Sequence, residues 1–495
     1  MKTKELKLYN SLSKKKEVFK PITEGFIGMY VCGPTVYSDV HLGNVRTFIS
    51  FDIMYRTLLY LGYKVRYVRN ITDVGHLLDD GEDRISKGAR LDKLEPMEVV
   101  QKYTNGFHDM MRIFNTKKPS IEPRATQHIL EQIEMVQQIL DNGYAYIANG
   151  SVYFDTLKFH EEQKCYGNLS GRIIEDLLSE SRDNLKNQSE KRHPSDFAIW
   201  MKASEDHLMK WNSPWSEGFP GWHLECSVMS TKYLGDTFDI HGGGNDLKFP
   251  HHENEVAQNV GACGCQPCNY WLHTNMLLMN GRKMSKSDGN TITPTQLFTG
   301  DSPHISKAYS PMVIKFFMLQ SHYSSTNDLT DDGLLAAEKG YKRIIEAQKI
   351  LKGLETKGTS DELDGDINAP LKQFVTDMCD DFNTPRAIAS LFDLVTKINS
   401  FKEGHLDVNK VSTSTLDKLK ETLPVYLTDI LGLETEQAGG GDNRSLDSVM
   451  QMVLELRQDA RAEKNWAVAD KIRDGLAEAK ILVKDGKDGS TWSIE

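Results

Sequence analysis

The sequence predicts an α/β fold: a Rossmann-like, doubly wound parallel sheet, split by an insertion and followed by an all-α helical bundle and a small C-terminal module. Three neighbouring segments predict the sheet. FIGMYVCG (26–33) is rich in β-forming residues and ends in a glycine, VRTFISFDIMYRTLLYL (45–61) repeats apolar residues at helical spacing, and KVRYVRNIT (64–72) again favours a strand. A strand, a glycine-containing connection, a helix and a second strand make the βαβ unit with which nucleotide-binding sheets begin.

Later segments indicate where this sheet is interrupted. Residues 126–142 have a helical pattern, YAYIANGSVYFD (144–155) favours a hairpin with an Asn-Gly turn, and 170–196 is polar and charged. From about residue 330 the pattern is helical. The expected organisation has five parts. A catalytic domain in two halves (1–125 and 216–285) encloses an insertion (126–215). A connecting region with a lysine-containing loop (286–335), a helical bundle (336–438) and a small C-terminal domain (442–495) follow.

Composition and charge limit the class of protein. The chain has 495 residues and a formal net charge of −11, which disfavours a nonspecific nucleic-acid binder unless a local basic patch meets the polyanion. The N-terminus lacks the apolar core of a signal peptide, and no apolar run of about 18 residues predicts a membrane span. Seven cysteines are an odd number and sparse for a disulfide framework. We therefore expect a reduced, cytoplasmic protein in which clustered cysteines indicate metal binding or catalysis.

The first connection of the sheet has the features of a phosphate-binding turn. His41-Leu42-Gly43-Asn44 lies between the first strand and its helix, where free backbone N–H groups and the positive helix end attract anions. Gly43 lets a phosphate approach the backbone, and the His41 imidazole can donate to phosphate oxygens as charge develops. Taken alone, the tetrapeptide is better explained by a capped turn with an incidental histidine.

A second element lies far downstream, in GRKMSKSDGN (281–290). It places Lys283 and Lys286 in a glycine-flanked, serine-rich loop, where lysines can follow the moving charge of a leaving pyrophosphate. A lone basic loop would more often be solvated surface. The pair HLGN and KMSKS resembles the signature of the class I aminoacyl-tRNA synthetases, which implies ATP-dependent adenylation of an amino acid. The commonest form of the first motif is HIGH, and the Asn44 that replaces its last histidine still offers an amide donor.

Candidate metal ligands are spread over distant segments. In HHENEVAQ (251–258), His251 and Glu255 have i, i+4 spacing, so both project from one helix face. Such a pair usually only forms a surface hydrogen bond. Together with the thiols of Cys32 and Cys226 it would supply two sulfurs, one nitrogen and one oxygen, a sound tetrahedral zinc set. The spacing in the sequence does not show that the four residues meet.

The complete motif set is more specific. YVCGPTVY, GWHLECS, FDIHGGGNDL, FPHHENE and KMSKS occur in this order and resemble the cysteinyl-tRNA synthetase family. The resemblance runs from about residue 5 to 330, weakens through the helical region and returns in the tail at NWAVADKIRDGLAEAKILVKD. It implies one zinc ion per chain, held by Cys32, Cys226, His251 and Glu255. It also implies that the zinc binds the substrate thiolate, which a serine hydroxyl replaces poorly because it is a harder and less acidic ligand.

The resemblance further implies how the substrates are held. Gly33, Thr72 and Trp222 would seat the amino acid, although core packing explains Trp222 equally well. ATP, with Mg²⁺, would contact the phosphate turn, the lysine loop and the second glycine-rich strand end: His41, Gly43, Asn44, His241, Gly243, Asp246, Lys283 and Lys286. Of these, the residues expected to act in catalysis are His41, Asn44, Lys283 and Lys286.

The implied function is activation of L-cysteine to cysteinyl-adenylate and its transfer to the 3′ end of tRNA(Cys) by a monomer, with the helical bundle binding the anticodon. One alternative is an ATP-dependent cysteine ligase that transfers cysteine to a small-molecule amine, for which the long helical tail has no use. Another is a noncatalytic zinc- or tRNA-binding module, which the intact KMSKS and phosphate turn argue against. Basic residues at 339–352 would contact tRNA phosphate or form a solvated helix face.

Two segments fit none of these roles. GACGCQPCNYW contains Cys263, Cys265 and Cys268 without an obvious fourth ligand nearby. Reduced surface thiols explain it best, with a second metal site or a redox-sensitive cluster as alternatives. The segment 73–90, which includes His76, departs from the family pattern, and its role stays open.

Overall fold

The structure is a computed structural model. It describes two compact units, residues up to Leu433 and from Glu434 onward, which are treated separately below. The described residues are 5–75, 85, 89, 94–172, 190–205, 207–284, 289–358, 360–435, 443–463, 465–479, 481–486 and 489–494. Among them, no helix combines the length and apolar character needed to cross a membrane.

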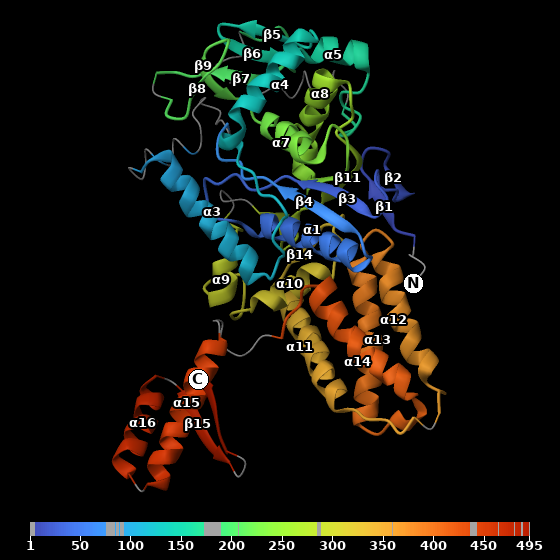
Figure 1. Ribbon diagram of the computed structural model, residues 1–495, viewed down its shortest axis with the longest axis vertical. Helices are drawn as coiled ribbons and strands as arrows, with labels where there is room; N and C mark the ends of the chain where they lie inside the picture. Colours follow the sequence, from blue (N-terminus) through green and yellow to red (C-terminus); the bar gives the residue numbers. More distant parts are fainter. Residues whose placement is uncertain are drawn as a thin grey trace. The chain divides into compact units, whose positions relative to one another are not determined.

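A four-stranded parallel sheet forms the centre of the first unit (Figure 1). The strand order is β11-β10-β3-β4, in which two strands that precede the insertion, β3 and β4, lie beside two strands that follow it, β10 and β11. This arrangement confirms the predicted split parallel sheet. The strand bounds are β3 Phe26–Val31, β4 Lys64–Arg69, β10 Phe238–Gly244 and β11 Cys268–Thr274.

Helices cover both faces of this sheet. The predicted helix at 45–61 is α1 (Leu42–Tyr60), and α7 (Leu224–Leu234) and α8 (His251–Cys263) come from the second half of the domain. Because side chains alternate along a strand, Met29 and Val31 of β3 pack in one buried cluster with Ile49 of α1, whereas Tyr30 packs in another with Leu224 of α7. The two buried clusters therefore fix α1 and α7 on opposite faces of the sheet.

The insertion forms an antiparallel sheet of its own, in the order β5-β6-β7-β9-β8. Its first hairpin turns at Asn149 and Gly150, both with positive φ, as the Asn-Gly signal predicts. The last of its strands in the chain, β9, lies beyond residue 215, and the exact segment boundaries stay a prediction. The bounds are α4 Ile129–Asp141, β5 Ala145–Ala148, β6 Ser151–Phe154, α5 Thr156–Gln163, β7 Phe197–Lys202, β8 Trp211–Asn212 and β9 Glu217–Pro220.

Smaller elements connect the sheet to its surroundings. A hairpin packs at the β11 edge, a helix follows β4, and a three-stranded sheet leads into the lysine loop. Their bounds are β1 Lys7–Asn10, β2 Lys15–Val18, α3 Pro96–Ile113, β12 Leu277–Met279, β13 Arg282–Lys283, α9 Pro294–Thr299, α10 Pro311–Leu319 and β14 Asn327–Leu329.

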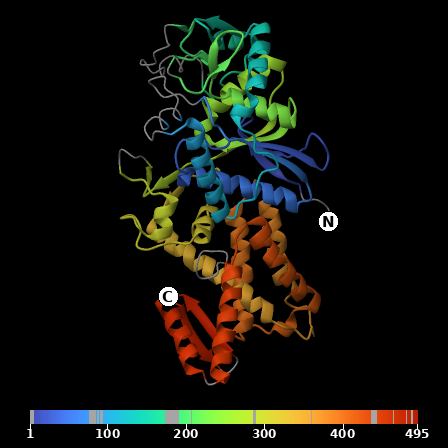
Figure 2. The same ribbon diagram turned by 60° about the vertical axis from the view of Figure 1, so that its left-hand side comes forward.

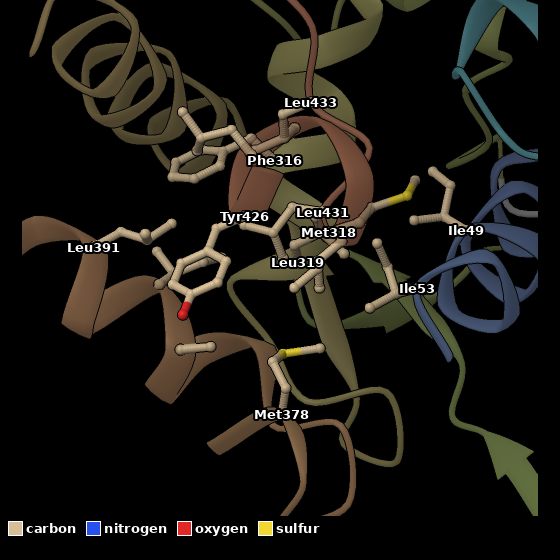
Figure 3. Close-up of a cluster of buried hydrophobic side chains, with 14 of the residues drawn as sticks. Ile49, Ile53, Phe316, Met318, Leu319, Met378, Leu391, Tyr426, Leu431 and Leu433 are labelled. Carbon is tan, nitrogen blue, oxygen red and sulfur yellow. The ribbon is translucent and has the colours of Figure 1, made fainter. Parts of the chain in front are cut away.

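The region after residue 330 is a helical bundle, as expected. Its core is continuous with the α1 face of the sheet: Figure 3 shows Ile49 and Ile53 of α1 beside Met318 and Leu319 of α10, with Tyr426 close by. In Figures 1 and 2 the bundle and the inserted sheet lie at opposite ends of this unit, with the parallel sheet between them. The helices are α11 Asp331–Gly353, α12 Asp364–Met378, α13 Thr384–Lys402 and α14 Thr413–Val425, followed by a π-helical turn at Tyr426–Ile430.

The second unit has the predicted order of two short helices and a hairpin. Helices α15 (Asn443–Ala462) and α16 (Trp466–Glu478) precede the antiparallel strands β15 (Ile481–Gly486) and β16 (Gly489–Ile494). Among its described side chains, Trp466 is 59% exposed.

Candidate active site and metal centre

Four side chains expected to bind a metal lie together at the carboxyl edge of the parallel sheet. Cys32 follows β3, Cys226 lies in α7, and His251 and Glu255 lie in the first turns of α8. The Cys32 Sγ atom is 3.7 Å from Cys226 Sγ, 3.4 Å from His251 Nε2 and 3.6 Å from Glu255 Oε1. All four ligand atoms lie within 4.8 Å of one another, and all four residues are buried. Two thiols, an imidazole and a carboxylate at these separations are chemically suited to a tetrahedral zinc ion.

The charge state of this cluster also fits a cation. Burial and the neighbouring Cys226 thiol raise the pKa of Cys32 well above its usual value. Burial alone would lower the pKa of His251, but Cys226 and Glu255 raise it well above the usual range. Burial opposes ionisation of Glu255, yet His241 and His251 hold its pKa at about 2. Glu255 is therefore ionised, whereas Cys32 and His251 hold protons that a metal would displace on binding, because a metal binds the deprotonated ligand.

A second group in the same place involves histidines that the sequence did not connect with the metal. Cys32, His241, His252 and Glu255 also have ligand atoms within 4.8 Å of one another. His252 Nε2 is 3.3 Å from Cys32 Sγ, and His241 Nε2 is 2.8 Å from Glu255 Oε2. His241 is fully buried and stacks on Trp271 with ring centroids 4.3 Å apart. These contacts give the candidate ligands Cys32 and Glu255 each a histidine partner besides His251.

A chain of hydrogen bonds extends from this group toward the N-terminus. His252 Nδ1 is 2.8 Å from His273 Nε2, and His273 Nδ1 is 2.8 Å from Ser11 Oγ. Burial lowers the pKa of both histidines well below the usual range, so they are neutral at pH 7. On the other side, His223 Nδ1 lies 2.7 Å from His251 Nδ1, which fixes the ring of that candidate ligand.

The residues expected to seat the amino acid adjoin the metal cluster. The Gly33 amide donates to Asn70 Oδ1 over 2.8 Å, and Asn70 Nδ2 donates to Thr72 Oγ1 over 2.9 Å. Thr72 Oγ1 in turn donates to the buried Glu225 Oε1 over 3.3 Å. A Cβ on Gly33 would lie 1.6 Å from the Asn70 carbonyl oxygen, so only glycine fits there.

Trp222 is half-buried, and its ring centroid lies 5.0 Å from that of His251. The indole therefore borders the metal cluster, at the start of the helix that carries Cys226.

The phosphate turn opens α1 at the same edge of the sheet. His41 is the N-cap residue, and its Nδ1 accepts a hydrogen bond from the Asn44 amide over 3.3 Å. A Cβ on Gly43 would lie 3.1 Å from the His41 ring, a tight contact that the exposed ring would have to move to relieve. His41 is exposed, so its ring is accessible to a ligand at the helix N-terminus.

The second glycine-rich strand end lies beside this turn. The Cys32 amide donates to the Gly242 carbonyl over 3.0 Å, which joins β3 to β10 directly below the metal cluster. A Cβ on Gly243 would lie 2.8 Å from the His252 ring, and Asp246 is exposed just beyond the strand. Ligands of doubly wound sheets bind in such a crevice, outside the carboxyl ends of the strands.

The lysine loop is described only in part. Lys283 is exposed in β13, which pairs with β12, and its carbonyl accepts a hydrogen bond from Asn290 Nδ2 over 2.9 Å. Lys286 lies outside the described residues, as does His76.

Comparisons with known proteins agree with this arrangement. The family model described as tRNA synthetases class I (C) catalytic domain matches residues 18–339. A curated cysteine–tRNA ligase of Porphyromonas gingivalis is 49% identical over 99% of both chains, and one of Bacteroides thetaiotaomicron is 50% identical over 99% of both. The chain belongs to the cysteine–tRNA ligase family.

The rest of the chain also matches models related to this family. A DALR domain covers residues 373–436 in the helical bundle, and a cysteinyl-tRNA ligase anticodon binding domain covers 443–492 in the second unit. Family membership thus extends beyond the catalytic sheet to the regions that the sequence assigned to the bundle and the tail.

Solved structures share the fold of this family member at low sequence identity. Methionyl-tRNA synthetase of Mycobacterium tuberculosis, in complex with methionyl-adenylate, has a TM-score of 0.60 and 11% identity, with 82% of this chain and 92% of that chain covered. A leucyl-tRNA synthetase of Agrobacterium radiobacter, in a ternary complex with tRNA, has a TM-score of 0.57 and 12% identity, with coverages of 84% and 86%. These matches confirm the predicted class I fold.

Several residues in the site of this family member carry no local sequence signal. His252, His273 and Ser11 come from three distant segments, Asn70 joins the site through Gly33 and Thr72, and Glu225 joins it through Thr72. His252 is the exception, because HHENE shows a second histidine directly beside the predicted ligand His251.

Proposed function

We propose that this chain activates L-cysteine with ATP to cysteinyl-adenylate and transfers the cysteinyl group to the 3′ end of tRNA(Cys). The observation that carries the proposal is the meeting of Cys32, Cys226, His251 and Glu255 at the sheet edge that also holds the His41 turn. The names of the relatives support the same reaction. A thiol-selecting centre and a nucleotide-binding turn then share one edge of the sheet.

The metal proposed at this centre is zinc, one per chain, held by Cys32, Cys226, His251 and Glu255. Of the two overlapping groups, this one has both thiols, and its imidazole is oriented by His223 through the other ring nitrogen. When bound, zinc would supply a soft Lewis acid that prefers the thiolate of cysteine to the hydroxyl of serine.

For His241 the geometry favours a supporting role over the contact with ATP expected from the sequence. Its Nε2 is already engaged with Glu255 Oε2, and its ring is fully buried between Trp271 and the cluster. Its main chain still belongs to the glycine-rich strand end at which we place the nucleotide, together with Gly243 and the exposed Asp246.

Residues next to the metal-binding cluster would orient the cysteine substrate. Gly33 and Thr72, linked through Asn70, and the Trp222 ring form the wall next to the cluster. Glu225 accepts from Thr72 and fixes the direction of its hydroxyl. We assign these residues the binding of the cysteine, so that its carboxylate points toward the His41 turn.

In the activation step, a carboxylate oxygen of cysteine attacks the α-phosphorus of ATP in line, and the bond to the bridging oxygen of pyrophosphate breaks. No protein side chain acts as nucleophile. His41 and Asn44, with the backbone at Gly43, stabilise charge on the phosphates at the N-terminus of α1. Lys283 and Lys286 follow the charge on the departing pyrophosphate, and Mg²⁺ accompanies ATP.

Transfer to tRNA distinguishes this proposal from the small-amine ligase. The match of residues 443–492 to an anticodon binding domain supports a tRNA acceptor. The test is to supply purified protein with cysteine, ATP and either tRNA(Cys) transcript or a panel of small amines, and to measure labelled product. Charging of the transcript alone is expected, and transfer to an amine without charging would contradict the proposal. A monomeric state and a cytoplasmic location remain predictions from the sequence.

A further inference from the structure

The cysteines that follow α8 do not act as one cluster. Cys268 begins β11, is 2% exposed, and its Sγ contacts the Tyr270 carbonyl at 3.6 Å, so its thiol belongs to the core. Cys263 is exposed at the end of α8, and Cys265 is half-buried just after it. The CxCxxC pattern of the sequence therefore separates into one core thiol and one pair that is open to solvent.

The turn between the two outer cysteines brings their side chains together. Gly264 caps α8 in the left-handed conformation with φ 73°, and nothing lies within 4 Å of where its Cβ would be. The reversal brings Cys265 Sγ within 3.4 Å of the Cys263 carbonyl, to which it donates. Burial and a hydrogen bond between the two thiols raise the pKa of Cys263 to about 11. The Cys265 thiol thus lies beside the main chain of Cys263 across an unobstructed glycine turn.

A metal is a poor explanation of this pair. Among the residues that the structure describes, the groups whose ligand atoms lie close enough to share an ion are the two buried sets around Cys32 and Glu255. Neither includes Cys263 or Cys265, and a structural zinc site needs four ligands. Two free thiols two residues apart, with the Cys265 sulfur 3.4 Å from the Cys263 carbonyl oxygen, are instead placed so that a disulfide could close across the turn.

We propose that Cys263 and Cys265 are a dithiol site that exchanges with low-molecular-weight disulfides and closes to an intramolecular disulfide. The Cys265 thiol loses its proton and attacks one sulfur of an external disulfide, which forms a mixed disulfide and releases one external thiolate. The Cys263 thiol then loses its proton and attacks the protein sulfur of that mixed disulfide, which closes the Cys263–Cys265 bond and releases the other external thiolate. The protein pair loses two electrons and two protons, and the external disulfide gains them.

The position of Cys263 and Cys265 at the end of α8 determines which hydrogen bonds a disulfide between them would break. The Cys263 thiol donates to the Asn259 carbonyl over 3.3 Å, a bond that disulfide formation removes from the last turn of α8. Asn259 Nδ2 donates to the Glu255 carbonyl over 2.9 Å, one turn closer to the candidate metal ligands. Closure therefore acts on the C-terminal end of α8 and leaves the ligand atoms at its other end in place.

The test uses the full chain with its metal bound. The protein is incubated with graded ratios of oxidised to reduced glutathione, free thiols are alkylated under denaturing conditions, and the tryptic peptide Phe249–Arg282, which contains all three cysteines, is weighed. In excess oxidised glutathione we expect this peptide to lose two of its three alkyl groups, with Cys268 still alkylated, and to regain them on reduction.

Variants distinguish a true pair from isolated thiols. C263S and C265S should lose the internal disulfide and show one glutathione adduct instead, while C268A, the matched control, should still lose two alkyl groups. The proposal would be overturned if the wild-type peptide kept all three alkyl groups, or if it carried only glutathione adducts. It would also be overturned if the bond involved Cys268. Because Cys263 and Cys265 lie at the surface, thermal melts of their variants should match the wild type and exclude misfolding.

Discussion

Arg46 donates from Nη1 to the main-chain oxygen of Met276 over 2.6 Å. The same guanidinium also donates to the carbonyls of Asn275, His322 and Ser325, and burial lowers its pKa to about 10. Arg46 lies in the first turns of α1, just after the phosphate turn, and Met276 immediately precedes β12, whose partner β13 carries Lys283. One buried side chain thereby sets the distance between the two motifs proposed to hold ATP.

Replacing Arg46 by lysine should slow the activation step, because an ammonium cannot reach four carbonyls in the planar arrangement of a guanidinium. We expect kcat of cysteine-dependent pyrophosphate exchange to fall by roughly 10- to 100-fold, the scale of a small misplacement of reacting groups. KM for cysteine should change little, since the metal cluster is elsewhere. R66K is the matched control, because Arg66 is exposed and donates to the Tyr233 carbonyl. An unchanged kcat in folded R46K would contradict this role.

Replacing Gly33 by alanine should displace the loop that carries Cys32. The added Cβ would lie 1.6 Å from the Asn70 carbonyl oxygen, within rigid backbone. Overpacking of this kind lowers the free energy of unfolding by about 1–3 kcal/mol, and both zinc content and cysteine binding should fall with it. At Gly353 of α11 a Cβ would meet nothing within 4 Å, so G353A should be neutral or stabilising by up to about 1 kcal/mol. Chemical denaturation gives the free energy of unfolding of both variants, and metal analysis gives their zinc content. Equal stability of G33A and wild type would contradict the expected clash with Asn70.

Replacing Cys226 by serine should remove most of the zinc. A hydroxyl in place of a thiolate costs more than the loss of an outer-shell partner, which already weakens affinity by about 10- to 100-fold. The buried Cys379 lies in the helical bundle, and C379A should keep one zinc per chain. The measurement is zinc per chain after dialysis against a chelator. Full occupancy in C226S would assign the metal to the alternative group with His241 and His252.

Glu122 gives a pH-dependent contribution to stability outside the metal centre. Burial opposes its ionisation, but His108 and Arg69, each 2.6 Å away, hold the pKa of Glu122 below its usual value. A carboxyl with a depressed pKa stabilises the fold above its unfolded pKa of about 4.3, and this contribution is lost as the pH falls through the lower, folded pKa. E122Q should therefore lower the free energy of unfolding at pH 7 by about 1–3 kcal/mol.

The difference between E122Q and wild type should shrink as the pH falls below about 4, where the unfolded chain takes up the proton first and the folded protein takes it up at its lower pKa. Denaturant titrations at several pH values measure this, with E24Q, at an exposed position, as the control. A difference that stays constant from pH 7 to pH 3 would exclude the ionised pair as its source.

Local patterns in the sequence predicted the helices and strands well, but they predicted fewer of the contacts between residues that are far apart in the chain. The strand at Phe26–Val31, the helix that follows it and the hairpin at Asn149-Gly150 depend on residue spacing and turn chemistry, both of which are local. The i, i+4 spacing correctly placed His251 and Glu255 on one side of α8. The four ligand candidates could be grouped only through the family resemblance, since nothing in the spacing brings Cys32 next to Cys226.

The supporting contacts could not be predicted, because each joins segments far apart in the chain. His273 receives its partner Ser11 from the N-terminal hairpin, and Arg46 finds its acceptors among main-chain carbonyls, which every residue has. The position of His241 next to Glu255 follows from the packing of β10 under α8, whereas a strand-end histidine in the sequence suggested a nucleotide contact. Such contacts depend on tertiary packing rather than on local sequence.

Pyrophosphate exchange into ATP, measured with cysteine and with serine as the only amino acid, tests the central claim most directly. The account predicts exchange with cysteine, and exchange with serine lower by more than the ~100-fold that a pocket without a metal achieves between near-isosteres. C226S should lose most of the exchange with cysteine and most of the preference over serine. Equal exchange with both amino acids, or full selectivity in zinc-free C226S, would contradict selection of the thiol by a metal at Cys32, Cys226, His251 and Glu255.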